Sequence, residues 1–225
     1  MKCSYCQQEI IRNLTVKELL FPFLIKSERC YFCQEKFKRI TAPTCPTCSK
    51  AGWTTMCDEC RQWQVLYPHY NFCHQALFCY DAAFKEWIYQ YKFLGDLRLQ
   101  ATFTAELQTY FSQKKDWIIC SIPLSGTRFV QRGFNQVEAF LQAAGITTQK
   151  LLEKTTDSSP QSEKNRQERL AAPQVFRATE NAPMIKNKKV LLVDDVYTTG
   201  RTLFHAAEIL QVYQPEKLQT FSLAR

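Results

Sequence analysis

The stretch "VLLVDDVYTTGRTL", from Val190 to Leu203, decides the fold class that we predict for this chain. A near-continuous apolar run ends in two adjacent carboxylates, Asp194 and Asp195, and a Thr-Thr-Gly turn follows before a helical pattern begins. An apolar run of this kind is typical of a strand that is buried on both faces in a parallel sheet. In such sheets the ligand site lies at the carboxyl ends of the strands, where both carboxylates are expected.

The segments before and after this stretch alternate between strand patterns and helical patterns. Strands are expected at 76–80, 117–122 and 218–224, and amphipathic helices are expected after Asp81, through 103–111, after Gly133 and over about 202–213. Strands that alternate with helices indicate an α/β fold. We therefore predict a mostly parallel sheet with helices on both faces, which occupies residues 64–225 and contains a flexible loop at about 153–174.

Eight of the eleven cysteines form four Cys-x-x-Cys pairs near the N-terminus. The pairs are Cys3 and Cys6, Cys30 and Cys33, Cys45 and Cys48, and Cys57 and Cys60. Two such pairs supply the four thiolates of a tetrahedral zinc site, so residues 1–63 are predicted to form a double zinc-ribbon module with two structural zinc ions. We expect sequential pairing, first with second and third with fourth; an interleaved cross-brace is the alternative.

A disulfide framework has the same cysteine count but requires an oxidising compartment. Cys3 and Cys6 leave no room for an apolar leader before them. The apolar run at 19–25 is interrupted by Pro22 and is too short to span a bilayer. These features favour a cytoplasmic protein without membrane insertion, in which the cysteines bind metal.

The formal charge of +8 would suit a nucleic-acid partner, but its distribution weakens that argument. Residues 1–63 contain ten Lys and Arg against six Asp and Glu, and residues 64–225 contain nineteen against fifteen, so each part is formally +4. Eight thiolates and two zinc ions would add −8 and +4 to the first part and bring it close to zero. Net charge alone therefore does not establish a nucleic-acid surface.

The turn after the acidic doublet has the composition of a phosphate site. The predicted residues of that site are Thr198, Thr199, Gly200, Arg201 and Thr202. A helix N-terminus carries partial positive charge and unpaired amides, and hydroxyl side chains add further donors. The adjacent carboxylates would repel a phosphate, so they are expected to accept hydrogen bonds from sugar hydroxyls or to hold a divalent cation. A ribose 5-phosphate group satisfies both requirements.

Two common nucleotide-binding loops are absent from the sequence. With six glycines, the chain contains neither Gly-x-x-x-x-Gly-Lys nor Gly-x-Gly-x-x-Gly, which excludes a P-loop ATPase and a Rossmann dehydrogenase. The remaining structural alternative is that the acidic doublet only caps the following helix, for which one aspartate would suffice.

The stretch 190–203 resembles the phosphoribosyl diphosphate (PRPP) motif of type I phosphoribosyltransferases. The wider arrangement is similar to the ComF family of bacterial competence proteins: four cysteine pairs, "YKFLGD", "SIPLSGTRFVQRGFNQ", an Arg-rich loop and then the PRPP motif. The resemblance covers essentially the whole chain. It implies a type I phosphoribosyltransferase-like fold preceded by the zinc module.

The resemblance also implies roles for individual residues. Asp194 and Asp195 would contact the ribose 2- and 3-hydroxyls as the catalytic pair, and 198–202 would surround the 5-phosphate. The segment 123–128 matches a pyrophosphate loop in which Arg128 meets the diphosphate, and Arg132 would face the same site. If the site is active, PRPP would bind with Mg²⁺. A flexible lid would contribute Lys164, Arg166 and Arg169.

Two functions from different classes follow from the resemblance. The first is a competence protein that supports DNA uptake in natural transformation, with a domain that binds PRPP or a nucleotide and with single-stranded DNA and a competence helicase as partners. It would act in the cytoplasm, recruited to a membrane-associated uptake machinery. The second is an active Mg²⁺-dependent phosphoribosyltransferase of unknown acceptor. Basic and aromatic residues expected to contact DNA are Trp53, Arg61, Trp63, Lys92 and Phe93.

Overall fold

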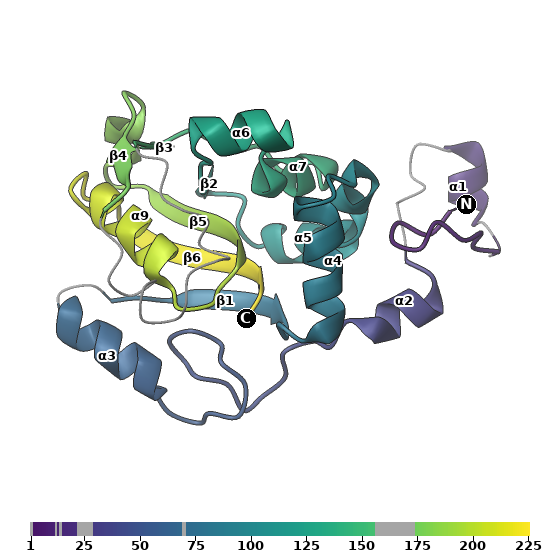
Figure 1. Ribbon diagram of the computed structural model, residues 1–225, viewed down its shortest axis with the longest axis horizontal. Helices are drawn as coiled ribbons and strands as arrows, with labels where there is room; N and C mark the ends of the chain where they lie inside the picture. The colour runs from purple at the N-terminus through teal and green to yellow at the C-terminus, as the bar shows by residue number, and fades with distance from the viewer. Residues whose placement is uncertain (1, 12, 14, 22–28, 69–70, 156–173) are drawn as a thin grey trace.

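The computed structural model describes residues 2–11, 13, 15–21, 29–68, 71–155 and 174–225. Figure 1 shows the chain as a sheet with helices packed around it and with the N-terminal segment extending to one side. The elements are, in chain order, α1 (Val16–Leu20), α2 (Tyr31–Lys36), α3 (Asp58–Leu66), β1 (His74–Phe78), α4 (Ala82–Lys92), η2 (Leu97–Ala101), α5 (Thr104–Phe111), β2 (Trp117–Ser121), α6 (Gly126–Arg132), α7 (Gln136–Ala143), β3 (Leu152–Lys154), β4 (Phe176–Ala178), η3 (Ala182–Ile185), β5 (Lys189–Val196), α9 (Arg201–Gln211) and β6 (Lys217–Ala224).

The main sheet is parallel, as the alternation of strands and helices predicts. Its order is β1-β6-β5-β2, and each neighbouring pair is parallel. The strand that contains the acidic doublet, β5, is therefore central and pairs with β2 on one side and β6 on the other. A second sheet joins β3 and β4 in antiparallel register. The flexible loop predicted at about 153–174 begins within β3, and its residues 156–173 lie outside the described residues.

Alternation of side chains along β5 divides the core into two layers. Val190 and Leu192 belong to a cluster with α9 and the third and fourth cysteine pairs, whereas Leu191 and Val193 belong to a cluster with α4, α5 and α7. All four are fully buried. Because successive side chains of a strand point to opposite faces, one apolar run supplies both layers. The helices on the two faces confirm the predicted fold class (Figure 1).

The region before β1 contacts the rest of the chain at several places, including two that lie far apart in its own sequence. In the first, Lys36 forms an ion pair with Glu86 at 2.7 Å, and Arg29 is buried in an ion pair with Glu106. In the second, Trp63 from α3 stacks on Phe204 from α9 with ring centroids 4.3 Å apart. The division at residue 63 remains a prediction, but the second contact shows that α3 shares a core with the sheet domain.

Candidate functional site

The acidic doublet occupies the end of β5. Asp194 pairs with Ser222 in the register of β6, and Val196 is the last residue of the strand. Strand alternation directs neighbouring side chains to opposite faces, so Asp195 belongs to the face covered by α4 and α7. The Asp194 carboxylate accepts a hydrogen bond from the Asp195 amide at 2.8 Å. The strand thus presents two carboxylates at its carboxyl end with different surroundings.

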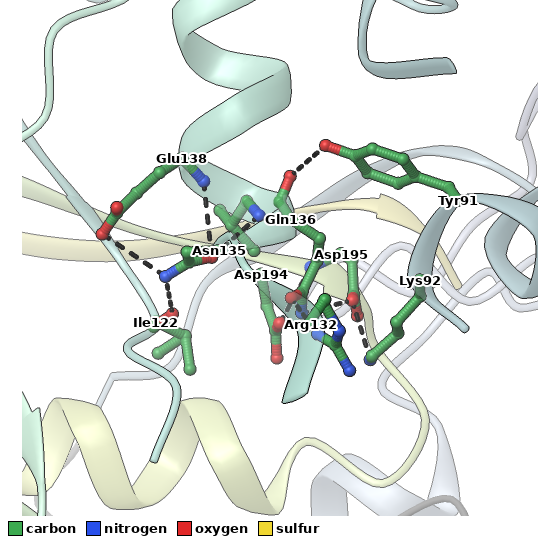
Figure 2. Close-up of polar contacts among 10 residues, drawn as sticks. Tyr91, Lys92, Ile122, Arg132, Asn135, Gln136, Glu138, Asp194 and Asp195 are labelled. Atoms are coloured by element: carbon green, nitrogen blue, oxygen red, sulfur yellow. Dashed lines mark hydrogen bonds and ion pairs between the residues drawn. The ribbon is translucent and has the colours of Figure 1, made fainter. Parts of the chain in front are cut away.

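Asp195 is held by two side chains that come from distant parts of the chain. Lys92 at the end of α4 donates to its Oδ2 at 2.9 Å, and Gln136 at the start of α7 donates to the same oxygen at 2.9 Å. Figure 2 shows both side chains converging on this carboxylate, with Arg132 close by. Tyr91 donates to the Gln136 carbonyl at 2.7 Å and fixes the start of α7. Asp195 is 4% exposed, and its Oδ2 atom accepts hydrogen bonds from both an ammonium and an amide.

The two carboxyl groups have opposite pKa shifts. Burial, together with the charge of Asp195, raises the pKa of Asp194 to about 7. Burial also disfavours the charge of Asp195, but Lys92 and Gln136 hold the pKa of that carboxyl below its ordinary value. Near neutral pH the doublet therefore has one fixed negative charge and one group close to its midpoint. Such a pair can accept hydrogen bonds from a diol and can also exchange a proton.

The turn after β5 is closely packed on its own side chains. Gly200 has φ +80°, and a Cβ atom there would lie 2.6 Å from the Tyr197 Cζ atom, so the position requires glycine. Thr199 is buried, and its carbonyl accepts a hydrogen bond from the Trp63 indole at 2.7 Å. Thr198 is exposed. The helix that follows, α9, leaves its first amides without intrahelical partners, as at any helix N-terminus.

Arg128 and Arg132 lie near the acidic doublet on a helix that the sequence does not predict. The segment 123–128 is expected to be a loop, but α6 begins at Gly126 and places Arg128 and Arg132 one turn apart on one face. Gly133 is expected to open the next helix; it ends α6 with φ +80°, and Asn135 caps α7. The short helix explains how both arginines can approach a single ligand.

One cleft of about 740 Å³ brings most of the predicted site residues together. Of the residues predicted from the sequence, those that line it are Asp194, Asp195, Thr198, Thr202, Arg128 and Arg132. Thr199 and Arg201 instead lie against Trp63: the Arg201 guanidinium is 5.7 Å from the indole centroid. Gly200 contributes its backbone to the turn. The lid residues Lys164, Arg166 and Arg169 lie outside the described residues.

Sequence reasoning missed several residues that line the cleft. Lys92 and Gln136 contact Asp195, and Lys154 and Phe93 also line the cavity. The sequence suggests Lys92 and Phe93 only as DNA contacts. Lys92 lies within "YKFLGD" and Gln136 ends "RGFNQ", two motifs on which the family resemblance depends. These two motifs are the sequence signal by which Lys92 and Gln136 could have been assigned to the site, although both residues are far from the doublet in the sequence.

The cysteine pairs form two clusters in sequential order. Cys3, Cys6, Cys30 and Cys33 form one, and Cys45, Cys48, Cys57 and Cys60 form the other, with all sulfurs of each cluster within 4.8 Å of one another. The Sγ atoms of Cys48 and Cys57 are 3.6 Å apart, and those of Cys6 and Cys30 are 3.8 Å apart. A tetrahedral zinc ion with Zn–S bonds of about 2.3 Å separates its sulfurs by about 3.8 Å. Both clusters fit a structural zinc ion, and none of the eleven cysteines is in a disulfide.

The two clusters differ in exposure. Every cysteine of the second cluster is buried, whereas Cys6 of the first is exposed.

The residues that the sequence suggests as DNA contacts also differ in exposure. Trp63 is 3% exposed and packs against Phe204, so its predicted stacking on DNA bases is wrong, whereas Phe93 is 52% exposed. In the described part of the chain, no helix is long and apolar enough to span a bilayer.

Comparison with known proteins defines the class first. Residues 99–225 match the family model "Phosphoribosyl transferase domain", which covers β2, β5, β6 and the turn between β5 and α9. Among solved structures, the hypoxanthine-guanine phosphoribosyl transferase of L. donovani is 13% identical over 54% of this chain and 66% of that chain, with a TM-score of 0.29. That likeness is weak, so the class rests on the domain match and the parallel sheet.

Two curated relatives identify the family. The competence protein ComFC of Streptococcus pneumoniae (strain ATCC BAA-255 / R6) is 36% identical over 225 residues, with all of both chains covered. The competence protein ComFC of Bacillus subtilis (strain 168) is 28% identical over 99% of this chain and 94% of that protein. The chain belongs to the ComFC family of competence proteins.

Proposed function

We propose that the chain is a competence protein that supports DNA uptake and that its cleft binds PRPP or a nucleotide. The names of the two relatives support the competence role. The ligand class is supported by one observation: the acidic doublet, two threonines of the turn and two arginines line the same cleft. A sugar diol, a 5-phosphate and a diphosphate would each find a complementary group there.

Each part of the cleft suits a different part of this ligand. Asp195, kept charged by Lys92, accepts a hydrogen bond from one ribose hydroxyl, and Asp194 accepts from the other. The amides at the start of α9 and the Thr198 hydroxyl surround the 5-phosphate. Arg128 and Arg132 neutralise the diphosphate. The Lys92 ammonium already pairs with Asp195, so ligand hydroxyls share this carboxylate with it.

Magnesium is the metal that a PRPP-binding cleft implies, and the donors in the cleft fit it. Mg²⁺ prefers carboxylate and phosphate oxygens, and Asp194 and Asp195 are the carboxylates at the end of β5. When bound, the ion would neutralise charge on the diphosphate. The chain's own groups orient the sugar, because the doublet fixes the diol while the turn fixes the phosphate.

Isothermal titration calorimetry with PRPP and Mg²⁺ tests the ligand proposal. Asp195→Asn removes the charge that pairs with Lys92, and we expect PRPP affinity to fall by about tenfold or more, because a hydrogen bond to a charged group contributes about 1.5–3 kcal/mol. Asp116→Asn is the matched control, since Asp116 is largely exposed and pairs with Lys189 away from the cleft. Wild-type protein that is folded and releases no heat with PRPP would refute the proposal.

We include single-stranded DNA and a competence helicase among the proposed partners, with recruitment from the cytoplasm to a membrane-associated uptake machinery. Exposed Phe93 stacks with Tyr89 at 5.8 Å, and such rings offer bases a stacking surface. DNA binding should fall steeply as salt is raised, and it should survive Asp195→Asn. Binding that is insensitive to salt, or lost with the carboxylate, would contradict this arrangement.

An active phosphoribosyltransferase is the second candidate, and the pKa of Asp194 near 7 favours it. A carboxyl group with that pKa can accept a proton at neutral pH, which is what a general base requires. Release of pyrophosphate from PRPP with a panel of bases and amines, lost in Asp194→Asn, would establish this activity. PRPP binding without turnover across the panel would leave the binding role alone.

A further inference from the structure

The turn between β5 and α9, residues 197–200, is called the phosphate turn. Residues of the N-terminal region contact this turn. The Trp63 indole Nε1 donates to the Thr199 carbonyl at 2.7 Å, and the two residues are 136 positions apart. Both are buried. A buried carbonyl without a partner costs free energy, so the turn is stable in this position only while Trp63 occupies its place. The same indole stacks on Phe204 in the first turn of α9.

Trp63 is in turn held by the second cysteine cluster. It lies on α3, a helix of nine residues that begins after Cys57 and contains Cys60, two members of that cluster. A helix of this length is marginal by itself in water. An ion bound by Cys57 and Cys60 fixes the first turn of the helix, and Trp63 follows three residues after Cys60 on the same face.

A second contact joins this cluster to the turn. Glu59, which lies between Cys57 and Cys60, forms an ion pair with Arg225 at 3.0 Å. The Arg225 guanidinium lies 4.2 Å from the centroid of the Tyr197 ring, the ring on which Gly200 is packed. The side chains of Arg225 and Glu59 are largely buried. The beginning and the end of the turn are thus both fixed by α3.

We propose that Trp63 is a positioning residue for the phosphate turn and that metal in the second cysteine cluster sets the ligand affinity of the cleft. We expect no such effect from the first cluster, because the contacts described for its segment are not with the turn. The Ser4 carbonyl accepts a hydrogen bond from Thr102 at 3.3 Å, and Lys36 forms an ion pair with Glu86. This inference rests on the proposed PRPP site for its affinity effect but not for its structural effect.

Trp63→Phe tests the positioning role without removing the ring. The variant keeps most of the stacking on Phe204 and removes the donor to Thr199. We expect amide hydrogen exchange at 197–203 to become at least fivefold faster in the ligand-free protein and PRPP affinity to fall about five- to tenfold. Trp53→Phe is the control, since Trp53 packs against the same core cluster, and it should change neither quantity. Wild-type exchange and affinity in Trp63→Phe would overturn the proposal.

The metal contribution is tested by single cysteine variants in each cluster. Cys60→Ser and Cys6→Ser should each reduce the zinc count from two to one by native mass spectrometry. Only Cys60→Ser should accelerate exchange at 197–203 and weaken PRPP binding by tenfold or more, whereas Cys6→Ser should stay within twofold of wild type. Equal effects of the two variants would overturn the metal part. If Cys60→Ser does not fold, the Trp63→Phe exchange result decides the inference.

These measurements separate two failures. Wild-type protein that does not bind PRPP defeats the proposed function, but faster exchange of the turn in Trp63→Phe still supports the positioning role. Wild-type protein that binds PRPP, with a Trp63→Phe variant equal to it in exchange and affinity, defeats the inference and leaves the proposed function in place.

Discussion

Asp194 and Asp195 are adjacent in sequence, and their surroundings give them different charge states. Asp195 has an ammonium and an amide donor within 2.9 Å, whereas Asp194 has a raised pKa because it is buried beside a second carboxylate. The doublet can therefore bind a neutral diol without having two full charges in one place. Paired carboxylates elsewhere divide protonation in the same way.

The raised pKa of Asp194 predicts a stability change with pH. A folded-state pKa of about 7, above the ordinary value of a carboxyl group, contributes stability that is present at low pH and is lost as pH rises toward 7. Asp194→Asn lacks this titration. We expect its free energy of unfolding, relative to wild type, to rise by about 2 kcal/mol between pH 5.5 and pH 8. Urea unfolding at several pH values measures the difference, and a constant difference would contradict the raised pKa.

How much of the site a sequence reveals depends on the separation of its residues. The doublet and the turn are contiguous, so one stretch predicts both the acidic pair and the phosphate turn. Lys92 and Gln136 lie 103 and 59 positions from Asp195. A single lysine or glutamine does not by itself indicate a binding site. No local pattern marks them as partners of a carboxylate. Their contact depends on how α4 and α7 pack on the same face of β5.

At the scale of elements, the turn between β5 and α9 depends on one glycine. Gly200→Ala would place a methyl group against the Tyr197 ring at a φ of +80°, so both strain and overlap oppose it. We expect a loss of about 2–3 kcal/mol in the free energy of unfolding and a large loss of PRPP affinity.

Gly145 is the matched control for that substitution. It has φ +74°, and a methyl group added there would have nothing within 4 Å, so Gly145→Ala should cost only about 1 kcal/mol of backbone strain and leave PRPP affinity unchanged. Chemical denaturation with calorimetry distinguishes the two variants. Equal losses of stability would show that the Tyr197 ring does not restrict the turn.

The helix α6 shows where local patterns are insufficient. The family resemblance implies a pyrophosphate loop at 123–128, and the sequence places the start of the next helix at Gly133. In the structure, Gly126 begins the helix and Gly133 ends it. A helix of seven residues that begins at one glycine and is followed by another has too little periodicity to be predicted. Both arginines named from the family resemblance line the cleft, and their contact with a diphosphate stays a prediction.

At the scale of the whole molecule, the cysteine clusters are attached to the sheet domain in different ways. The second cluster shares a hydrophobic core with α9 and β5, and the first touches the domain through α2 and the buried Arg29. Cysteine spacing predicts both metal sites equally well. It carries no information about which of them packs against a core, because that depends on Trp63 and Phe72 meeting Phe204.

Metal removal should therefore have unequal consequences. We expect Cys48→Ser to lower the melting temperature of the sheet domain markedly, because an uncoordinated second cluster loosens a shared core. Cys33→Ser should release one zinc ion and lower it much less. Differential scanning calorimetry with zinc quantification compares the two variants. Equal decreases in melting temperature would show that the second cluster does not stabilise the domain.

Hydrogen–deuterium exchange with and without PRPP and Mg²⁺ tests the central claim most directly, because it locates the ligand on the chain. We expect protection of the turn and helix start at 197–203, of the doublet at the end of β5, and of α6 with its two arginines. Protection that is absent, or that appears elsewhere while these segments exchange as in the free protein, would contradict the proposed binding site.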